Sequence, residues 1–239
     1  MKRFSFTIAY SFALIAILCS ARQQQGHSML FWAEKLLSGI NEKNTAYIHK
    51  NISVSWGDDG NTVQCYADCS GFINSLIAKT YNWNEDDFKK SFGKKRPFAY
   101  TYFDAVVAGN HFQQINNVKD IMSGDLIVLK YADRSEHEDN TGHCMLVISS
   151  PRKMAPEKVI EPNTVQYEIT VMDCSKSPHG KSDTRNLENG EKYDGLGKGI
   201  FRLYVDRDGK IVAYSWSIGH PKPDFNPYEN PVTVGRFIP

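Results

Sequence analysis

Apolar residues recur at helical spacing in the first half of the chain. One such segment covers residues 27–40, and a second starts at Cys69 and is expected to end near Tyr81. Shorter helices are predicted after Asn84, a suitable capping residue, and over residues 98–107. The first half is therefore predicted to be mainly helical.

Short apolar runs of strand type replace this pattern after Gly124. Strands are predicted over residues 125–131, 143–149, 167–172, 199–205 and 210–216. The last two flank the turn 206–209, which is typical of a hairpin. Helices followed by about five antiparallel strands indicate an α+β fold in which the helix starting at Cys69 packs on the sheet. The Pro-rich residues 221–239 are expected to form an extended tail over the surface.

The first 21 residues have the organisation of a signal peptide. Basic residues 1–3 precede the apolar residues 4–18, and small residues 19–21 suit cleavage. The apolar stretch is shorter than the ~20 residues that a membrane span needs. We expect an exported protein, periplasmic or secreted, with no stable membrane span after removal of the signal. Acylation of Cys19, as in a lipoprotein, is the less favoured alternative.

Composition fits a single domain over residues 22–239. Hydrophobic residues make up 41% of the sequence, which is enough for a substantial core. The formal net charge of +1 argues against a nucleic-acid partner, which requires a basic excess. The sequence implies no metal and no organic cofactor.

Cys69 is the candidate nucleophile. Asp68 or Ser70 can cap the following helix, which places Cys69 at or within its first turn. The helix dipole and the unpaired N–H groups at that end favour thiolate over thiol. We expect Cys69 to attack an acyl carbon.

His143 is the candidate base, because it opens an apolar strand after a glycine. Asp173 ends the next predicted strand and can orient the imidazole. His179 is the rival for that role, although a histidine in a loop is more often solvated.

Strand alternation bears on the remaining cysteines. If His143 and Asp173 face one side, Cys144 and Cys174 face the other, within disulfide range or as two buried thiols. Cys65 would then remain unpaired.

Two metal sites are weaker alternatives. The acidic loop 136–139 offers oxygen ligands for a cation, but a solvated loop explains it more simply. The other is a zinc-type set without the usual ligand spacing. Its members are Cys65, Cys69, His143 and Cys174.

Three motifs resemble the NlpC-type cell-wall cysteine peptidases, which are papain-like enzymes. They are Asp68-Cys69-Ser70-Gly71-Phe72, Gly124-Asp125-Leu126-Ile127 and Gly142-His143. The resemblance covers roughly residues 56–175 and implies Cys69 as nucleophile, His143 as base and Asp173 as the third polar residue. It also implies a papain-like core over about residues 50–220, and that Asp68 and Ser70 hold the free amino end of a stem peptide.

Where the family has a tyrosine before two glycines, this chain has Trp56 before Gly57. Trp56 and Tyr66 are therefore candidates for that substrate contact. Arg185, as a receptor for a substrate carboxylate, and His179 are candidates at the cleft edge.

These expectations lead to an exported cysteine peptidase that cleaves bacterial peptidoglycan stem peptides or muropeptides. Two alternatives remain. The same residues could hydrolyse or transfer another exported amide or acyl group, or the domain could bind cell wall with an inert cysteine.

Overall fold

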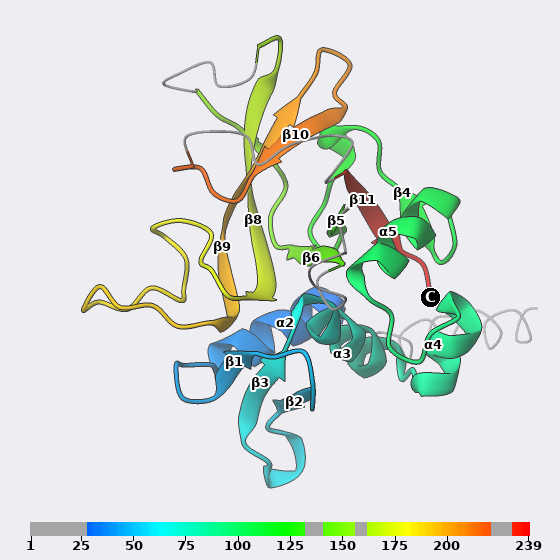
Figure 1. The fold of residues 1–239 in the computed structure, drawn as a ribbon, viewed down its shortest axis with the longest axis vertical. Helices are drawn as coiled ribbons and strands as arrows, with labels where there is room; N and C mark the ends of the chain where they lie inside the picture. The colour runs from blue at the N-terminus through cyan, green and yellow to red at the C-terminus, as the bar shows by residue number, and fades with distance from the viewer. Residues whose placement is uncertain (1–27, 132–140, 156–161, 221–230) are drawn as a thin grey trace, which may run out of the picture.

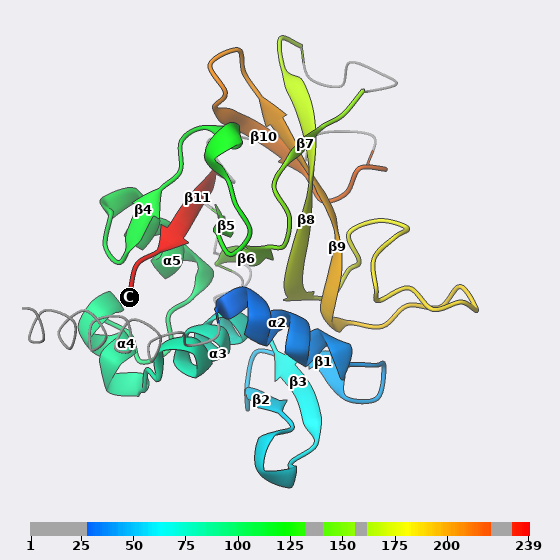
Figure 2. The ribbon, with the colours of Figure 1, turned by 180° about the vertical axis from the view of Figure 1, so that it is seen from behind.

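The computed structural model describes residues 28–131, 141–155, 162–220 and 231–239. Within these ranges the chain forms helices, a three-stranded sheet and an eight-stranded sheet (Figures 1 and 2). The predicted signal peptide and the loop 136–139 lie outside the described residues. Among those described, no helix is both long and apolar enough to cross a membrane.

The predicted helices are present. Their bounds are α2 (Met29–Ser38), α3 (Cys69–Tyr81), α4 (Glu85–Phe92) and α5 (Ala99–Ala108). Asp68 caps α3, and Asn82 follows it in the left-handed conformation that ends many helices. The expectation that Cys69 lies in the first turn of this helix is confirmed.

A small sheet sits immediately before α3. Its strands are β1 (Thr45–Tyr47), β2 (Ser53–Trp56) and β3 (Val63–Ala67), with β3 in the middle, parallel to β1 and antiparallel to β2. Because β3 ends at Ala67, one residue before the cap, this sheet fixes where α3 begins. No clear strand pattern in the sequence marks these strands, which are short and mostly half-buried.

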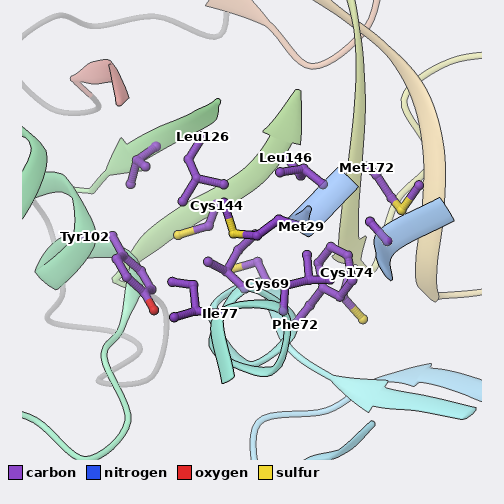
Figure 3. Packing of buried hydrophobic residues seen from close by; sticks show 14 of the residues in the cluster. Met29, Cys69, Phe72, Ile77, Tyr102, Leu126, Cys144, Leu146, Met172 and Cys174 are labelled. Atoms are coloured by element: carbon purple, nitrogen blue, oxygen red, sulfur yellow. The ribbon is translucent and has the colours of Figure 1, made fainter. Parts of the chain in front are cut away.

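The large sheet has the order β10-β9-β8-β6-β5-β11-β4, with β7 paired to β8, and its pairs are antiparallel. Its strands are β4 (Phe112–Gln114), β5 (Leu126–Lys130), β6 (Gly142–Val147), β7 (Arg152–Lys153), β8 (Val165–Ser175), β9 (Gly195–Val205), β10 (Ile211–Ser215) and β11 (Val232–Phe237). Although β10 and β11 are far apart in this order, they are in contact, so the sheet curls around an apolar cluster that includes Phe201 and Val234. Its other face packs on α2, α3 and α5 (Figure 3).

The prediction of a papain-like core with about five strands is wrong. The five predicted strands exist, but the large sheet has eight, and the small sheet comes in addition. The tail was also mispredicted, because β11 lies between β5 and β4. Prolines around it hid the strand: Pro231 precedes it directly, and Gly235 interrupts its apolar pattern.

Candidate active site

Cys69 is the first residue of α3 and is only 4% exposed. The first N–H groups of a helix have no carbonyl partner within it. One of them, from Gly71, is donated to Asp68 Oδ1 at 2.7 Å, which anchors the turn that carries the sulfur. The seat at the positive end of the helix favours the thiolate.

Gly142 lets His143 enter the site. Gly142 has φ 143°, and a Cβ built on it would overlap the backbone carbonyl of Leu129 on the paired strand β5. His143 is the second residue of β6, opposite Leu129, and its ring lies edge-on to Trp216 with centroids 4.9 Å apart. The imidazole is 5% exposed.

Strands β6 and β8 are paired only at Leu146–Met172 and Val147–Val171. Beyond these pairs the strands part, and Asp173 follows Met172 at this opening. Its Oδ2 lies 2.5 Å from His143 Nε2. Because Nε2 is engaged, Nδ1 is the ring nitrogen left to interact with the Cys69 sulfur, which raises the pKa of His143.

Cys144 contacts the same sulfur from the other face of β6. Neighbouring residues of a strand point to opposite sides, and Cys144 belongs to the cluster packed on α3 (Figure 3). The hydrogen bond from Cys144 is the largest influence on Cys69 and lowers its pKa, burial opposes it, and the charge of His143 lowers it further, to about 5. Burial alone would lower the pKa of His143, but the Cys69 thiolate and the bond to Asp173 raise it to about 10. At neutral pH the two groups therefore form a thiolate–imidazolium pair.

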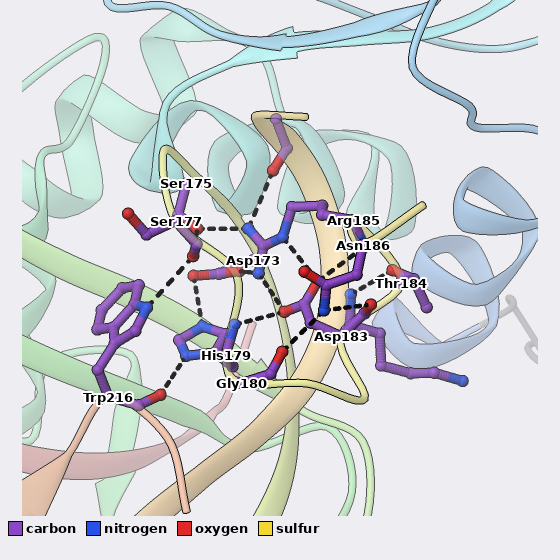
Figure 4. A network of polar contacts seen from close by, with 12 residues as sticks. Asp173, Ser175, Ser177, His179, Gly180, Asp183, Thr184, Arg185, Asn186 and Trp216 are labelled. Carbon is purple, nitrogen blue, oxygen red and sulfur yellow. Dashed lines mark hydrogen bonds and ion pairs between the residues drawn. The ribbon is translucent and has the colours of Figure 1, made fainter. Parts of the chain in front are cut away.

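A fully buried ionic network holds Asp173 from behind (Figure 4). His179 Nε2 lies 2.9 Å from Asp173 Oδ2, and Arg185 Nη2 lies 3.1 Å from Oδ1. Burial would raise the pKa of Asp173, but the charges of His179 and Arg185 and the hydrogen bonds keep it well below its usual range. Arg185 is itself paired to Asp183 at 2.7 Å.

His179 links Asp173 to the residue that follows β10. Its Nδ1 lies 2.7 Å from the carbonyl oxygen of Trp216, and its Nε2 lies 2.9 Å from Asp173 Oδ2. Both partners are hydrogen-bond acceptors, so both ring nitrogens of His179 are engaged.

Alternate glycines of β9 make room for this network. Gly197 pairs with Asp173, and a Cβ there would overlap the Arg185 side chain. A Cβ on Gly199 would overlap the Asp183 carboxylate and crowd His179. The glycines are thus needed for close packing of a buried charge cluster.

Comparison with known proteins gives a relative without an assigned activity. No family model and no solved structure matches the chain. The uncharacterized protein R653 of Acanthamoeba polyphaga mimivirus is 35% identical over 219 residues, which cover 88% of this chain and 96% of the viral protein. The chain belongs to the R653 family. Because the relative is uncharacterized, the function of this R653-family member has to be argued from its site.

The structure brings some of the predicted site residues together and separates others. Cys69, His143 and Asp173 are in contact as described. Asp68 and Ser70 lie beside Cys69, buried, with Ser70 Oγ 3.1 Å from Asp68 Oδ1.

The other four predicted substrate residues point elsewhere. Arg185 and His179 are fully buried and occupied behind Asp173, so they do not edge a cleft. Trp56 pairs with Val63, at the end of β3 away from Cys69. The Tyr66 hydroxyl donates to the carbonyl of Lys43. Two of these four residues therefore lie behind Asp173, and the side chains of the other two have partners away from Cys69.

Sequence reasoning missed three residues next to the site. Tyr47 lies close enough that, after burial, the charges of Cys69 and Asp68 raise its pKa. His49 Nδ1 lies 3.2 Å and Arg96 Nη2 2.5 Å from Asp68 Oδ2. None belongs to a motif, and the parallel pairing of β1 with β3, which places Tyr47, had no signal in the sequence.

The thiols are arranged differently from the expectation. The four cysteines of the described residues are free and buried. Cys144 pairs with Cys69, while Cys174 interacts with Cys65 and with the carbonyl of Ala67 at 2.9 Å. Cys144 and Cys174 remain apart because β6 and β8 have already separated at this level.

The buried donors His143, Asp173 and His179 cluster closely enough to be considered as a metal site. Ligand atoms around tetrahedral zinc are about 3.3 Å apart, because each lies about 2.0–2.1 Å from the ion. Here the ring nitrogens lie 2.5 and 2.9 Å from the carboxylate oxygen, which is hydrogen-bond geometry. The zinc-type set suggested by the sequence does not converge in the structure.

Proposed function

We propose that this protein is an exported cysteine hydrolase that cleaves peptide bonds in bacterial stem peptides. Cys69 attacks the acyl carbon, His143 passes its proton to the leaving amine, and Asp173 orients the imidazole. The N–H groups at the start of α3 stabilise the oxyanion. The observation that carries the proposal is that the Cys69 sulfur lies 4.0 Å from the carbonyl oxygen of Gly142, next to His143, whose Nε2 lies 2.5 Å from a buried carboxylate.

The proposed substrate is supported by the sequence alone. The support consists of the three motifs around Cys69, Asp125 and His143. Export rests on the pattern of residues 1–21.

The test is to incubate the protein lacking residues 1–21 with purified sacculi and identify released fragments by mass spectrometry. Cys69→Ala should lower the rate of release by about 10³-fold or more, because no other group supplies the nucleophile. Cys65→Ala, which removes a buried thiol outside the pair, is the matched control. Unchanged release by Cys69→Ala would falsify the proposal. If the protein hydrolyses other amides but leaves sacculi intact, the proposed substrate is wrong and the proposed chemistry is retained.

A further inference from the structure

The acceptor positions of the Asp68 carboxylate are occupied by hydrogen-bond donors of the protein itself. Its Oδ1 accepts hydrogen bonds from Gly71 N at 2.7 Å and Ser70 Oγ at 3.1 Å. Its Oδ2 lies 2.5 Å from Arg96 Nη2 and 3.2 Å from His49 Nδ1. A carboxylate offers about four acceptor positions. Asp68 therefore has no position left for the free amino end of a substrate.

Two of the four donors to Asp68, Arg96 and His49, are presented to solvent. The side chains of Arg96 and His49 are 32% and 31% exposed, against 5% for Asp68. A guanidinium has five N–H donors, and Nη2 is the atom of Arg96 with a hydrogen bond to another described residue. Its Nε is buried without an acceptor among these residues.

Besides Arg96, a second cation is connected to this group of side chains. Lys176 is exposed directly after β8, and its ammonium is 5.9 Å from the ring centroid of Tyr47. The Tyr47 ring in turn contacts that of His49, with centroids 5.0 Å apart. The contacts thus run from Lys176 through Tyr47 and His49 to Asp68, the cap of α3, whose negative charge is paired with Arg96.

We propose that Arg96, His49 and Lys176 form a binding site for a carboxylate of the substrate next to Cys69. The substrate is then an acyl compound with a free carboxylate near the scissile bond, recognised by charge-assisted hydrogen bonds. This identification of the ligand as substrate rests on the proposed hydrolase function, but binding of the anion does not.

Alkylation of Cys69 tests the site without turnover. Iodoacetate carries a carboxylate, whereas iodoacetamide is its neutral analogue, and peptide mapping reports modification of Cys69 itself. The ratio of the two rate constants cancels changes in the reactivity of the thiolate. We expect this ratio to fall about two- to fivefold in Arg96→Gln and in Lys176→Gln, as for loss of a partly exposed ion pair, and further in the double variant.

Two variants control for charge and fold. Lys210→Gln removes an equal charge from the exposed β9–β10 hairpin, far from α3 in Figure 1, and should leave the ratio unchanged. Arg96→Lys should keep most of the preference for iodoacetate. The proposal is overturned if Lys176→Gln and Arg96→Gln both match the wild-type ratio, and Lys176→Gln decides alone if Arg96→Gln does not fold.

The two proposals can fail separately. Preference for iodoacetate that depends on these cations, without hydrolysis of any amide, would remove the hydrolase function and leave an anion site. Hydrolysis of an amide with an unchanged alkylation ratio in the variants would support the hydrolase function and exclude the anion site.

Discussion

Cys144, the residue after His143, lowers the pKa of Cys69. Its S–H bond to the Cys69 sulfur is the largest influence that lowers the Cys69 pKa from 9.0 to about 5. The proton stays on Cys144 because burial, and then this bond, hold its own pKa well above the usual range. The pair is therefore one thiolate stabilised by one thiol.

Cys144→Ala should raise the pKa of Cys69 by about one to two units, because a hydrogen bond to a charged group contributes about 1.5–3 kcal/mol. The measurement is the rate of Cys69 alkylation by iodoacetamide against pH, read by peptide mapping. Cys144→Ser keeps a donor and should retain most of the low pKa. An unchanged midpoint in Cys144→Ala would show that the bond does not stabilise the thiolate.

His179 holds Asp173 by charge as well as by a hydrogen bond. His179→Leu should lower the free energy of unfolding by about 3 kcal/mol or more, because it leaves a buried carboxylate with one cation fewer. Urea denaturation measures the loss. In combination with Asp173→Asn the loss should be much smaller than the sum of the two, whereas additive losses would contradict the coupling.

That Cys69, His143 and Asp173 lie close together could be predicted from the sequence, whereas the buried groups behind Asp173 could not. Cys69 follows a capping aspartate at the start of a periodic run, and strand alternation put His143 and Asp173 on one side. Arg185 and His179 lie between β8 and β9, in a segment whose course has no periodic signal. Their burial depends on the space left by Gly197 and Gly199, which a sequence pattern does not reveal.

At the scale of elements, the close pairing of β5 with β6 at Gly142 determines where His143 lies in the site. Gly142→Ala should lower the free energy of unfolding by at least about 1–2 kcal/mol from the positive φ alone, and by more from overlap with the Leu129 carbonyl. It should also slow alkylation of Cys69 by displacing His143. Gly190→Ala is the matched control, because Gly190 has φ 86° but open space around a Cβ. Equal losses in the two variants, measured by thermal unfolding, would mean that the close approach is unimportant.

Helices and strands with a clear pattern of apolar residues could be predicted from the sequence. Strands that depend on pairing with distant segments could not. The apolar runs of β5 and β6 are buried along nearly their whole length, so composition alone marks them. β11 exists because it fills the position between β5 and β4. Such a strand depends on long-range pairing that local sequence does not encode.

At the scale of the molecule, the site depends on three distant segments meeting where two strands separate. The small sheet positions the start of α3, and Gly142 allows the imidazole of His143 to reach the site. The loop between β8 and β9 supplies the buried residues that contact Asp173. The R653 relationship covers 88% of this chain and 96% of the viral protein, so it concerns the whole assembly rather than one motif.

The thiolate–imidazolium pair should shape how the stability of the whole protein varies with pH. The folded pKa of Cys69 is about 5 against 9.0, so its contribution is complete above pH 9.0 and is lost as the pH falls to about 5. The folded pKa of His143 is about 10 against 6.5, so its contribution is complete below pH 6.5 and is lost as the pH rises to about 10. Counting both groups, the unfolded chain binds one proton more than the folded chain between pH 5 and 6.5, an equal number between 6.5 and 9.0, and one fewer between 9.0 and 10.

The free energy of unfolding should therefore rise by about 1.4 kcal/mol per pH unit in the first interval, stay level in the second and fall with the same slope in the third. Urea denaturation at closely spaced pH values measures the curve, and subtraction of the Cys69→Ser curve removes titrations that the two proteins share. Serine stays neutral and leaves Asp173 as the anionic partner of His143. The difference curve should therefore still rise from about pH 5, level off and fall between pH 9.0 and 10. A flat difference curve would mean that sulfur and imidazole are both uncharged in the folded protein, and nucleophilic attack by a preformed thiolate would then have no basis.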